Sequence, residues 1–138
     1  MTARLFAEAL GTFFLFATVM GAGIMADNLA DGNVAVALIG TTLPIGAILY
    51  VIITMFAPVS GAHFNPAVTL VFRLRGEIES GAALAYVAVQ IASGIFAAFV
   101  VHLMFDLPIV QISTVARTGW GQRGGLANLD SGISGFSA

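Results

Sequence analysis

Apolar residues in this chain gather in three long runs that short polar segments separate. Residues 5–26 carry a single charged side chain, Glu8, over 22 positions. Residues 32–72 carry no Asp, Glu, Lys or Arg over 41 positions, and residues 80–105 carry none over 26. A helix that crosses a bilayer needs about 20 predominantly apolar residues. The first and third runs, residues 5–26 and 80–105, therefore each predict one membrane-spanning helix.

The middle run is too long for one span and too short for two spans joined by a turn. Helix-breaking residues cluster between Pro58 and Pro66. Residues 34–57 therefore predict the second span, in which Pro44 should introduce a kink or a local break. The remainder, residues 58–75, is too short to cross the bilayer again.

The arginines predict how the chain is oriented in the membrane. Arg4 precedes the first span, and Arg73 and Arg75 lie between the second and third spans, whereas the loop at 27–31 has no basic residue. Cytoplasmic loops of membrane proteins are enriched in Lys and Arg, so the N-terminus and the arginine-bearing loop are expected in the cytoplasm. Both lie there only if residues 58–75 enter and leave on that side, which predicts a re-entrant loop.

Asn65 and Pro66 mark the start of a helix within this re-entrant segment. An Asn side chain accepts hydrogen bonds from the free N–H groups of a first turn, and Pro is favoured at the first helical position. The helix is expected to run through Arg75 and to end at Gly76. About ten residues rise roughly 15 Å, which is half of a hydrocarbon core of about 30 Å. We therefore expect the Asn65 tip near the bilayer midplane.

Residues 60–64 must be non-helical to bring the chain back to the midplane. Such backbone is tolerated at that depth only where it is buried in protein or lines a watery cavity, and its carbonyl groups then form a row of acceptors. The positive end of the helix dipole repels cations, while the Asn65 amide can donate to a passing oxygen. This arrangement predicts a pore for neutral polar solutes. In a soluble loop the same Asn-Pro-Ala tripeptide would indicate only a surface turn.

Composition excludes the other broad classes of protein. The chain of 138 residues is 59 % hydrophobic and 9 % charged, with a mean hydropathy of +1.00, which excludes a soluble globular domain and a disordered chain. A net charge of −2 without lysine argues against nucleic acid as a partner. The absence of cysteine excludes thiol catalysis and disulfides. With no nucleophile–base pair or metal-ligand spacing in the sequence, we expect no enzyme, no cofactor and no metal.

Three segments carry a resemblance to a known family. Residues 60–69, Ser-Gly-Ala-His-Phe-Asn-Pro-Ala-Val-Thr, resemble the first Asn-Pro-Ala loop of the aquaporin and aquaglyceroporin (major intrinsic protein) family. Residues 7–13 resemble the start of its first helix, and residues 86–94 resemble its third helix. The resemblance covers residues 3 to about 119. It implies an all-α integral membrane protein with three transmembrane helices and one re-entrant half-helix, half of the family's inverted-repeat fold, and a channel for water or small neutral solutes.

The resemblance also implies roles for particular residues. The pore would be lined by the loop and the helix tip, at Gly61, Ala62, His63, Phe64, Asn65, Pro66 and Ala67. Glu8 would brace the loop backbone, although it could instead pair with Arg4 at the interface. Gln90 would hold the loop near His63, or serve only as a packing residue between helices. No second ligand stands at metal spacing from His63, and His102 is expected at the membrane interface.

Ile45 lies 20 residues before Asn65, at the second-helix position of the family's selectivity filter. Water-selective members commonly carry a large aromatic residue there, so Ile implies a wider, more apolar filter. That filter would favour glycerol-like solutes or undissociated metalloid acids over water alone. The alternative is that Ile45 only faces lipid or packs against a neighbouring helix.

The family carries two inverted copies of the three-span unit, and this chain carries one. Residues 1–106 are expected to form the half-channel repeat, and residues 107–138 an extracytoplasmic loop remnant with a flexible tail, from a truncation or a frameshift. The expected partners are the lipid bilayer, small solutes, and further copies of the chain (the family is typically tetrameric) or a complementary half. We expect a multi-pass plasma-membrane protein with a cytoplasmic N-terminus. The competing hypothesis is a non-conducting membrane polypeptide that at most assembles with other subunits.

Overall fold

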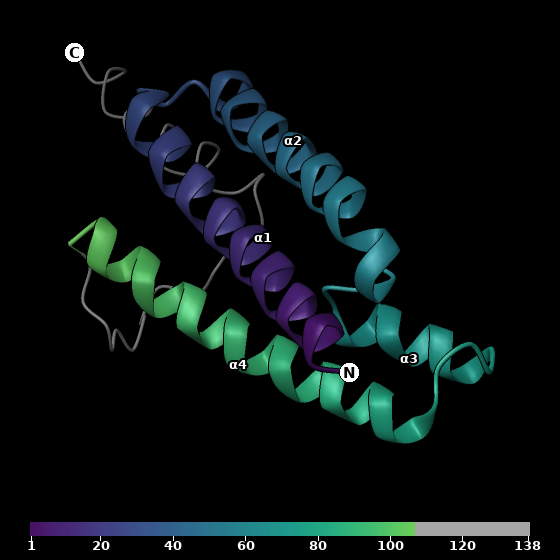
Figure 1. Cartoon of the computed structure of the whole chain (residues 1–138). Coiled ribbons are helices and arrows are strands. Elements are labelled where there is room, and N and C mark those ends of the chain that lie inside the picture. The colour runs from purple at the N-terminus through teal and green to yellow at the C-terminus, as the bar shows by residue number, and fades with distance from the viewer. Residues whose placement is uncertain (107–138) are drawn as a thin grey trace, which may run out of the picture.

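A computed structural model describes residues 1–106 as four helices joined by short connections (Figure 1). The helices are α1 (Thr2–Leu29), α2 (Val34–Ser60), α3 (Pro66–Leu74) and α4 (Ser80–Met104). Of these, α1, α2 and α4 are long and apolar enough to cross a membrane. The all-α fold with three spans and one short half-helix is thus confirmed. The loop remnant and tail expected at 107–138 lie outside the described residues.

Helix α1 lies in the middle of the arrangement, with α2 packed along one side and α4 along the other (Figure 1). Among the described helices, α2 and α4 do not pack against each other, and α3 packs against α4. The chain start lies next to α3 and the first turns of α4 (Figure 1). The three spans therefore form a single layer, and the half-helix lies at the end where α1 begins.

The second span extends three residues beyond its expected end at residue 57. Helix α2 continues through Pro58 and ends at Gly61, whose φ of 91° is left-handed and whose N–H donates to the Ala57 carbonyl at 3.0 Å. Glycine adopts this capping conformation without a steric penalty, so it sets the end of the helix more strongly than Pro58 does. Helix α2 is also unbroken at Pro44, which leaves a kink as the remaining interpretation of that proline.

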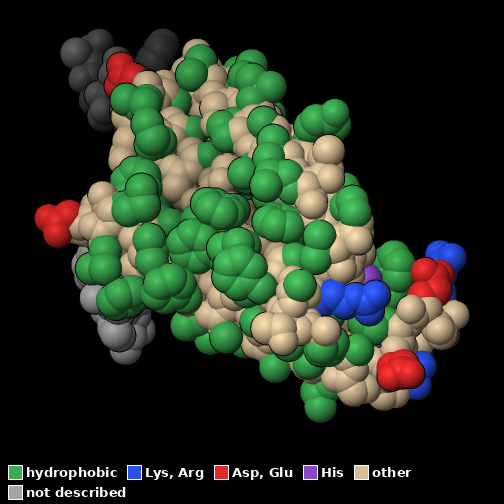
Figure 2. Space-filling model, viewed as in Figure 1, with side chains coloured by type: hydrophobic (Ala, Val, Ile, Leu, Met, Phe, Trp, Pro, Cys, Tyr) green, Lys and Arg blue, Asp and Glu red, His purple; other side chains and the backbone are tan. Residues whose placement is uncertain are grey.

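Large apolar side chains cover the outside of the three spans, as a lipid-facing surface requires. Figure 2 shows hydrophobic side chains over most of the visible face. The visible arginine side chains lie at the end that holds α3, whereas acidic side chains lie both there and at the opposite end. The most exposed apolar residues come from all three spans and include Phe6, Leu43, Met55, Ile95 and Leu103. The distribution is that of a protein whose apolar belt faces hydrocarbon.

Candidate functional site

The candidate site is the short loop between α2 and α3. Residues 61–64 are non-helical, and Asn65 is the N-cap of α3 with an extended φ of −151°. The Asn65 Oδ1 atom accepts a hydrogen bond from the Ala67 N–H at 2.8 Å, and Pro66 occupies the first helical position. Asn65 and Ala67 are exposed and Pro66 is half-buried. This is the helix start that the Asn-Pro sequence encodes.

The loop backbone turns through a left-handed conformation at three positions. The φ angles are 91° at Gly61, 54° at Ala62 and 50° at Phe64. For a residue with a side chain, this conformation costs about 1–3 kcal/mol. Ala62 and Phe64 therefore adopt it only because contacts around the loop hold them there.

Glu8 of α1 supplies the main contacts that hold the loop. Its Oε1 atom accepts hydrogen bonds from the His63 N–H at 3.0 Å and the Ser60 hydroxyl at 2.6 Å, and its Oε2 atom accepts from the Phe64 N–H at 2.7 Å. Glu8 is fully buried, and within residues 1–106 no ion pair joins it to Arg4. The geometry therefore corresponds to the bracing interpretation rather than to the alternative pairing with Arg4.

Gln90 supports the Glu8 carboxylate by a hydrogen bond from α4. Its Nε2 atom donates to Glu8 Oε2 at 2.9 Å and to the Thr69 hydroxyl at 3.0 Å. The Thr69 Oγ1 atom in turn lies 3.1 Å from His63 Nδ1. Gln90 thus reaches His63 through Thr69, so its contacts go beyond helix packing.

Three supporting residues were not predicted from the sequence: Ser60, Thr69 and Tyr86. The Ser60 hydroxyl, besides donating to Glu8, accepts from the Ala62 N–H at 3.1 Å. The Tyr86 hydroxyl donates to the Ser60 carbonyl at 2.9 Å. The sequence did contain a signal for two of them, because residues one helical turn apart lie on the same face of a helix. Tyr86 lies one turn before Gln90, and Thr69 lies one turn after Asn65.

The His63 ring is enclosed by aromatic neighbours. Its centroid lies 4.4 Å from that of Phe72 and 5.3 Å from that of Tyr86, and only 7 % of the residue is exposed. Its Nε2 edge lies against Gly61, where an added Cβ would come within 3.3 Å of Nε2. The ring therefore has one fixed orientation relative to the loop.

The Phe64 side chain points away from the loop surface into the helix layer. It is 1 % exposed, packs edge-on against Phe56 with ring centroids 6.0 Å apart, and lies over Gly11 of α1. Phe64 was expected to line the pore, but it can therefore contribute only its backbone carbonyl.

The loop is asymmetric in its hydrogen bonding. The N–H groups of Ala62, His63 and Phe64 all bond to side chains. By contrast, the carbonyl oxygens from Gly61 to Phe64 accept no hydrogen bond from any residue that the structure describes. Buried carbonyl groups are nearly always paired with protein or water. These four acceptors are therefore available to water or to a solute.

A cavity of about 310 Å³ lies beside the loop. Its lining combines residues of all four helices and the turn after α3: Arg4, Ala57, Pro58, Val59, Ser60, Gly61, His63, Phe72, Glu77, Ile78 and Tyr86. Arg4 and Glu77 give it a charged mouth, and Glu77 pairs with Arg75 at 2.5 Å. The cavity thus joins a charged surface to the inner face of the loop.

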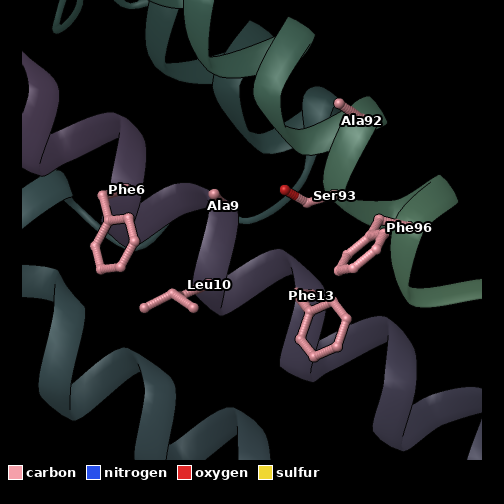
Figure 3. A pocket seen from close by; sticks show the side chains of 7 residues that line it. All are labelled: Phe6, Ala9, Leu10, Phe13, Ala92, Ser93 and Phe96. Carbon is pink, nitrogen blue, oxygen red and sulfur yellow. The ribbon is translucent and has the colours of Figure 1, made fainter. Parts of the chain in front are cut away.

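A second cavity, of about 410 Å³, lies between α1 and α4 and contains none of the expected pore residues. Figure 3 shows Phe6 at one end and Phe13 and Phe96 at the other, with Ala9, Leu10 and Ser93 between them and Ala92 farther along α4. Its lining is almost wholly apolar. It is a lipid-facing crevice rather than a path for polar solutes.

Two further residues singled out from the sequence, Ile45 and His102, lie on the spans away from the loop. Ile45 is half-buried in the first half of α2, 15 residues or about 22 Å of helix from Ser60. His102 lies in the last turn of α4, with Nδ1 2.7 Å from the Ala98 carbonyl. Across the described residues, no group of three or more acidic or histidine side chains could hold a metal ion.

These features define a multi-pass membrane protein with a re-entrant loop that ends in a half-helix. The sequence model of the major intrinsic protein family matches residues 1–128, and the chain belongs to that family. The aquaporins of this family are channels. No solved structure was found to match the chain.

Curated relatives include both aquaporins and an aquaglyceroporin. The chain is 50 % identical over 119 residues to aquaglyceroporin AqpS of Rhizobium meliloti, covering 86 % of this chain and 51 % of the relative. It is 34 % identical over 120 residues to a probable NIP-type aquaporin of Nicotiana alata, covering 86 % of this chain and 43 % of that relative. It is 32 % identical over 98 residues to aquaporin Z of Bradyrhizobium diazoefficiens, covering 71 % of this chain and 40 % of that relative. The chain spans about half the length of the relatives it matches.

Proposed function

We propose that this chain forms one wall of a membrane channel for the passive permeation of water and small neutral solutes. The wall consists of the carbonyl groups of residues 61–64, the His63 ring and the helix tip at Asn65, Pro66 and Ala67. The observation that carries the proposal is the asymmetric bonding of the loop. Its N–H groups bond to Glu8 and Ser60, while its carbonyl oxygens have no partner among the described residues.

Neutral polar solutes fit this chemistry better than ions do. A solute that leaves water must replace its lost hydrogen bonds, and four successive carbonyl groups supply acceptors for its O–H donors. The N-terminus of α3 carries a positive partial charge, which opposes a cation at the same depth. The Asn65 amide nitrogen donates to none of the described residues and supplies a donor for the solute's oxygen.

The solute class extends beyond water. Ile45 at the expected filter position would leave an opening wider and more apolar than an aromatic residue would, which favours glycerol-like solutes or undissociated metalloid acids. The relative with 50 % identity over 119 residues is named an aquaglyceroporin, which supports glycerol as a solute to test. The arginine distribution supports an orientation in which the N-terminus and the α3–α4 turn face the cytoplasm, and we propose the plasma membrane as the location.

A channel built on this chain needs a partner to cover the loop face. Gly61 and Asn65 are exposed, and each unpaired backbone group in hydrocarbon costs several kcal/mol. A complementary half or further copies of the chain would cover this face. The same exposed face supports the second candidate, a membrane polypeptide that does not conduct by itself and at most assembles with other subunits.

Reconstitution separates these two candidates. The purified chain is incorporated into liposomes alone, and in parallel together with the second half of the relative AqpS. Osmotic swelling is then followed for water and for glycerol. We expect little flux from the chain alone and rapid flux from the pair. Background flux in both preparations would reject the channel and favour the non-conducting polypeptide.

A further inference from the structure

We propose that Thr69 sets the hydrogen-bonding role of His63. It would keep the imidazole proton on Nδ1, inside the protein, so that Nε2 faces the cavity as an acceptor. Thr69 is then a positioning residue that adds a fifth acceptor to the four loop carbonyl groups. The effect on permeation rests on the proposed function of the loop, whereas the proton position does not.

The geometry around Thr69 Oγ1 is that of a saturated hydroxyl group. Thr69 is fully buried. Its Oγ1 atom lies 3.0 Å from Gln90 Nε2, 3.1 Å from His63 Nδ1 and 3.2 Å from the Asn65 carbonyl oxygen. A hydroxyl group offers one donor and two acceptor lone pairs. Gln90 Oε1 lies farther away, at 3.4 Å, so the three nearer neighbours match this capacity.

The direction of each bond follows from what each neighbour can do. The Gln90 Nε2 atom must donate, because its other partner is the Glu8 carboxylate, which also accepts from Ser60 and from two backbone N–H groups. The Asn65 carbonyl can only accept, and it accepts from the Thr69 N–H at 3.0 Å and from the Thr69 hydroxyl at 3.2 Å. With the hydroxyl proton directed to the Asn65 carbonyl, one lone pair of Thr69 remains for the Nδ1–H of His63. The network therefore assigns the Nδ1–H tautomer, which leaves Nε2 unprotonated.

The unprotonated Nε2 lies where a solute can reach it. It is the ring edge that faces Gly61, and Gly61 and His63 both line the 310 Å³ cavity. The structure gives Nε2 no hydrogen-bond partner within residues 1–106. Phe72 and Tyr86 hold the ring in this orientation. Five acceptors along the loop and the His63 ring favour solutes that carry several O–H donors, such as a polyol or an undissociated oxyacid.

Nitrogen-15 NMR of histidine-labelled protein in lipid bilayers tests the proton position. The His63 signals are assigned by comparison with the His102→Asn variant. In the unsubstituted chain we expect the population of the Nδ1–H tautomer to exceed that of the Nε2–H tautomer by about tenfold. This ratio is the effect of one hydrogen bond. In Thr69→Val, which keeps the side-chain shape, this excess should disappear, and in Thr69→Ser it should return. A predominance of Nε2–H in the unsubstituted chain, or an unchanged ratio in Thr69→Val, would overturn the assignment.

Flux measured with the AqpS second half tests the consequence for permeation. Glycerol flux relative to water should fall in Thr69→Val and recover in Thr69→Ser. If no preparation conducts, the proposed function fails while the NMR result still decides the tautomer. If the channel conducts and the glycerol-to-water ratio is the same in all three proteins, the selectivity role of Thr69 is wrong.

Discussion

The Phe64 ring occupies the space that any side chain at Gly11 would need. A Cβ atom added at Gly11 would lie 2.0 Å from Cε1 of Phe64, far inside van der Waals contact. Because Gly11 has no side chain, the Phe64 ring can pack against α1 at this position. Phe64 has a left-handed backbone, and this seat is part of what holds it in that conformation.

Gly11→Ala should consequently destabilise the fold. The new methyl group must push the Phe64 ring from its seat, and overpacking of this kind costs about 1–3 kcal/mol. Unfolding in lipid–detergent micelles, followed by circular dichroism, measures the change in the free energy of unfolding. Gly23→Ala on the same helix is the matched control, because nothing lies within 4 Å of its added Cβ. Equal stabilities of the two variants would refute the packing relationship.

Glu8→Gln should loosen the loop. The amide keeps one acceptor oxygen, but its NH₂ group then faces an N–H donor of His63 or Phe64. One buried donor left without a partner costs about 1–3 kcal/mol. Hydrogen exchange at the His63 and Phe64 amides should accelerate accordingly. Glu79→Gln is the control, because Glu79 is exposed and makes no side-chain capping bond. Unchanged protection in Glu8→Gln would show that the carboxylate does not brace the backbone.

Cysteine labelling tests the orientation of the three spans. The chain has no cysteine, so single substitutions give unambiguous signals. Asn28 and Glu77 are exposed at opposite ends of the spans, whereas the neighbouring Ala30 is 6 % exposed and would label poorly. A membrane-impermeant thiol reagent should reach Asn28→Cys from outside the cell and Glu77→Cys only from the cytoplasm. Labelling of both from the same side would rule out the arrangement.

Asn65→Asp should weaken the exclusion of cations in a conducting assembly. Aspartate is as good an N-cap as asparagine, so the substitution keeps the helix start and replaces an amide donor by an anion. Potassium leak from vesicles containing the chain and its complementary half should rise several-fold. Asn65→Ser keeps a neutral cap and should leave the leak low. If Asn65→Asp shows the leak of the unsubstituted chain, Asn65 does not face the narrow part of the path.

The spans and the half-helix could be predicted because local sequence determines them. A charge-free run of the right length and the Asn65-Pro66 helix start need no knowledge of tertiary contacts. The end of α2 was misplaced because Gly61, rather than Pro58, provides the left-handed cap. The inward turn of Phe64 could not be foreseen, since it depends on space at Gly11 across a helix interface. Thr69 and Ser60 were missed for the same reason, because their partners lie on other helices.

The bond between Glu8 and Gln90 joins residues 82 positions apart, which bears on how the protein is made. Glu8 enters the membrane with the first helix, before its partners exist. At about 5–20 residues per second, Gln90 follows roughly 4–16 s later. An acidic side chain costs about 3 kcal/mol at the centre of a membrane-spanning helix on insertion scales, and Glu8, in the second turn of α1, has a smaller cost of the same sign. The nascent first helix is therefore expected to rest near the membrane surface, or against the insertion machinery, until the third span arrives to complete the network.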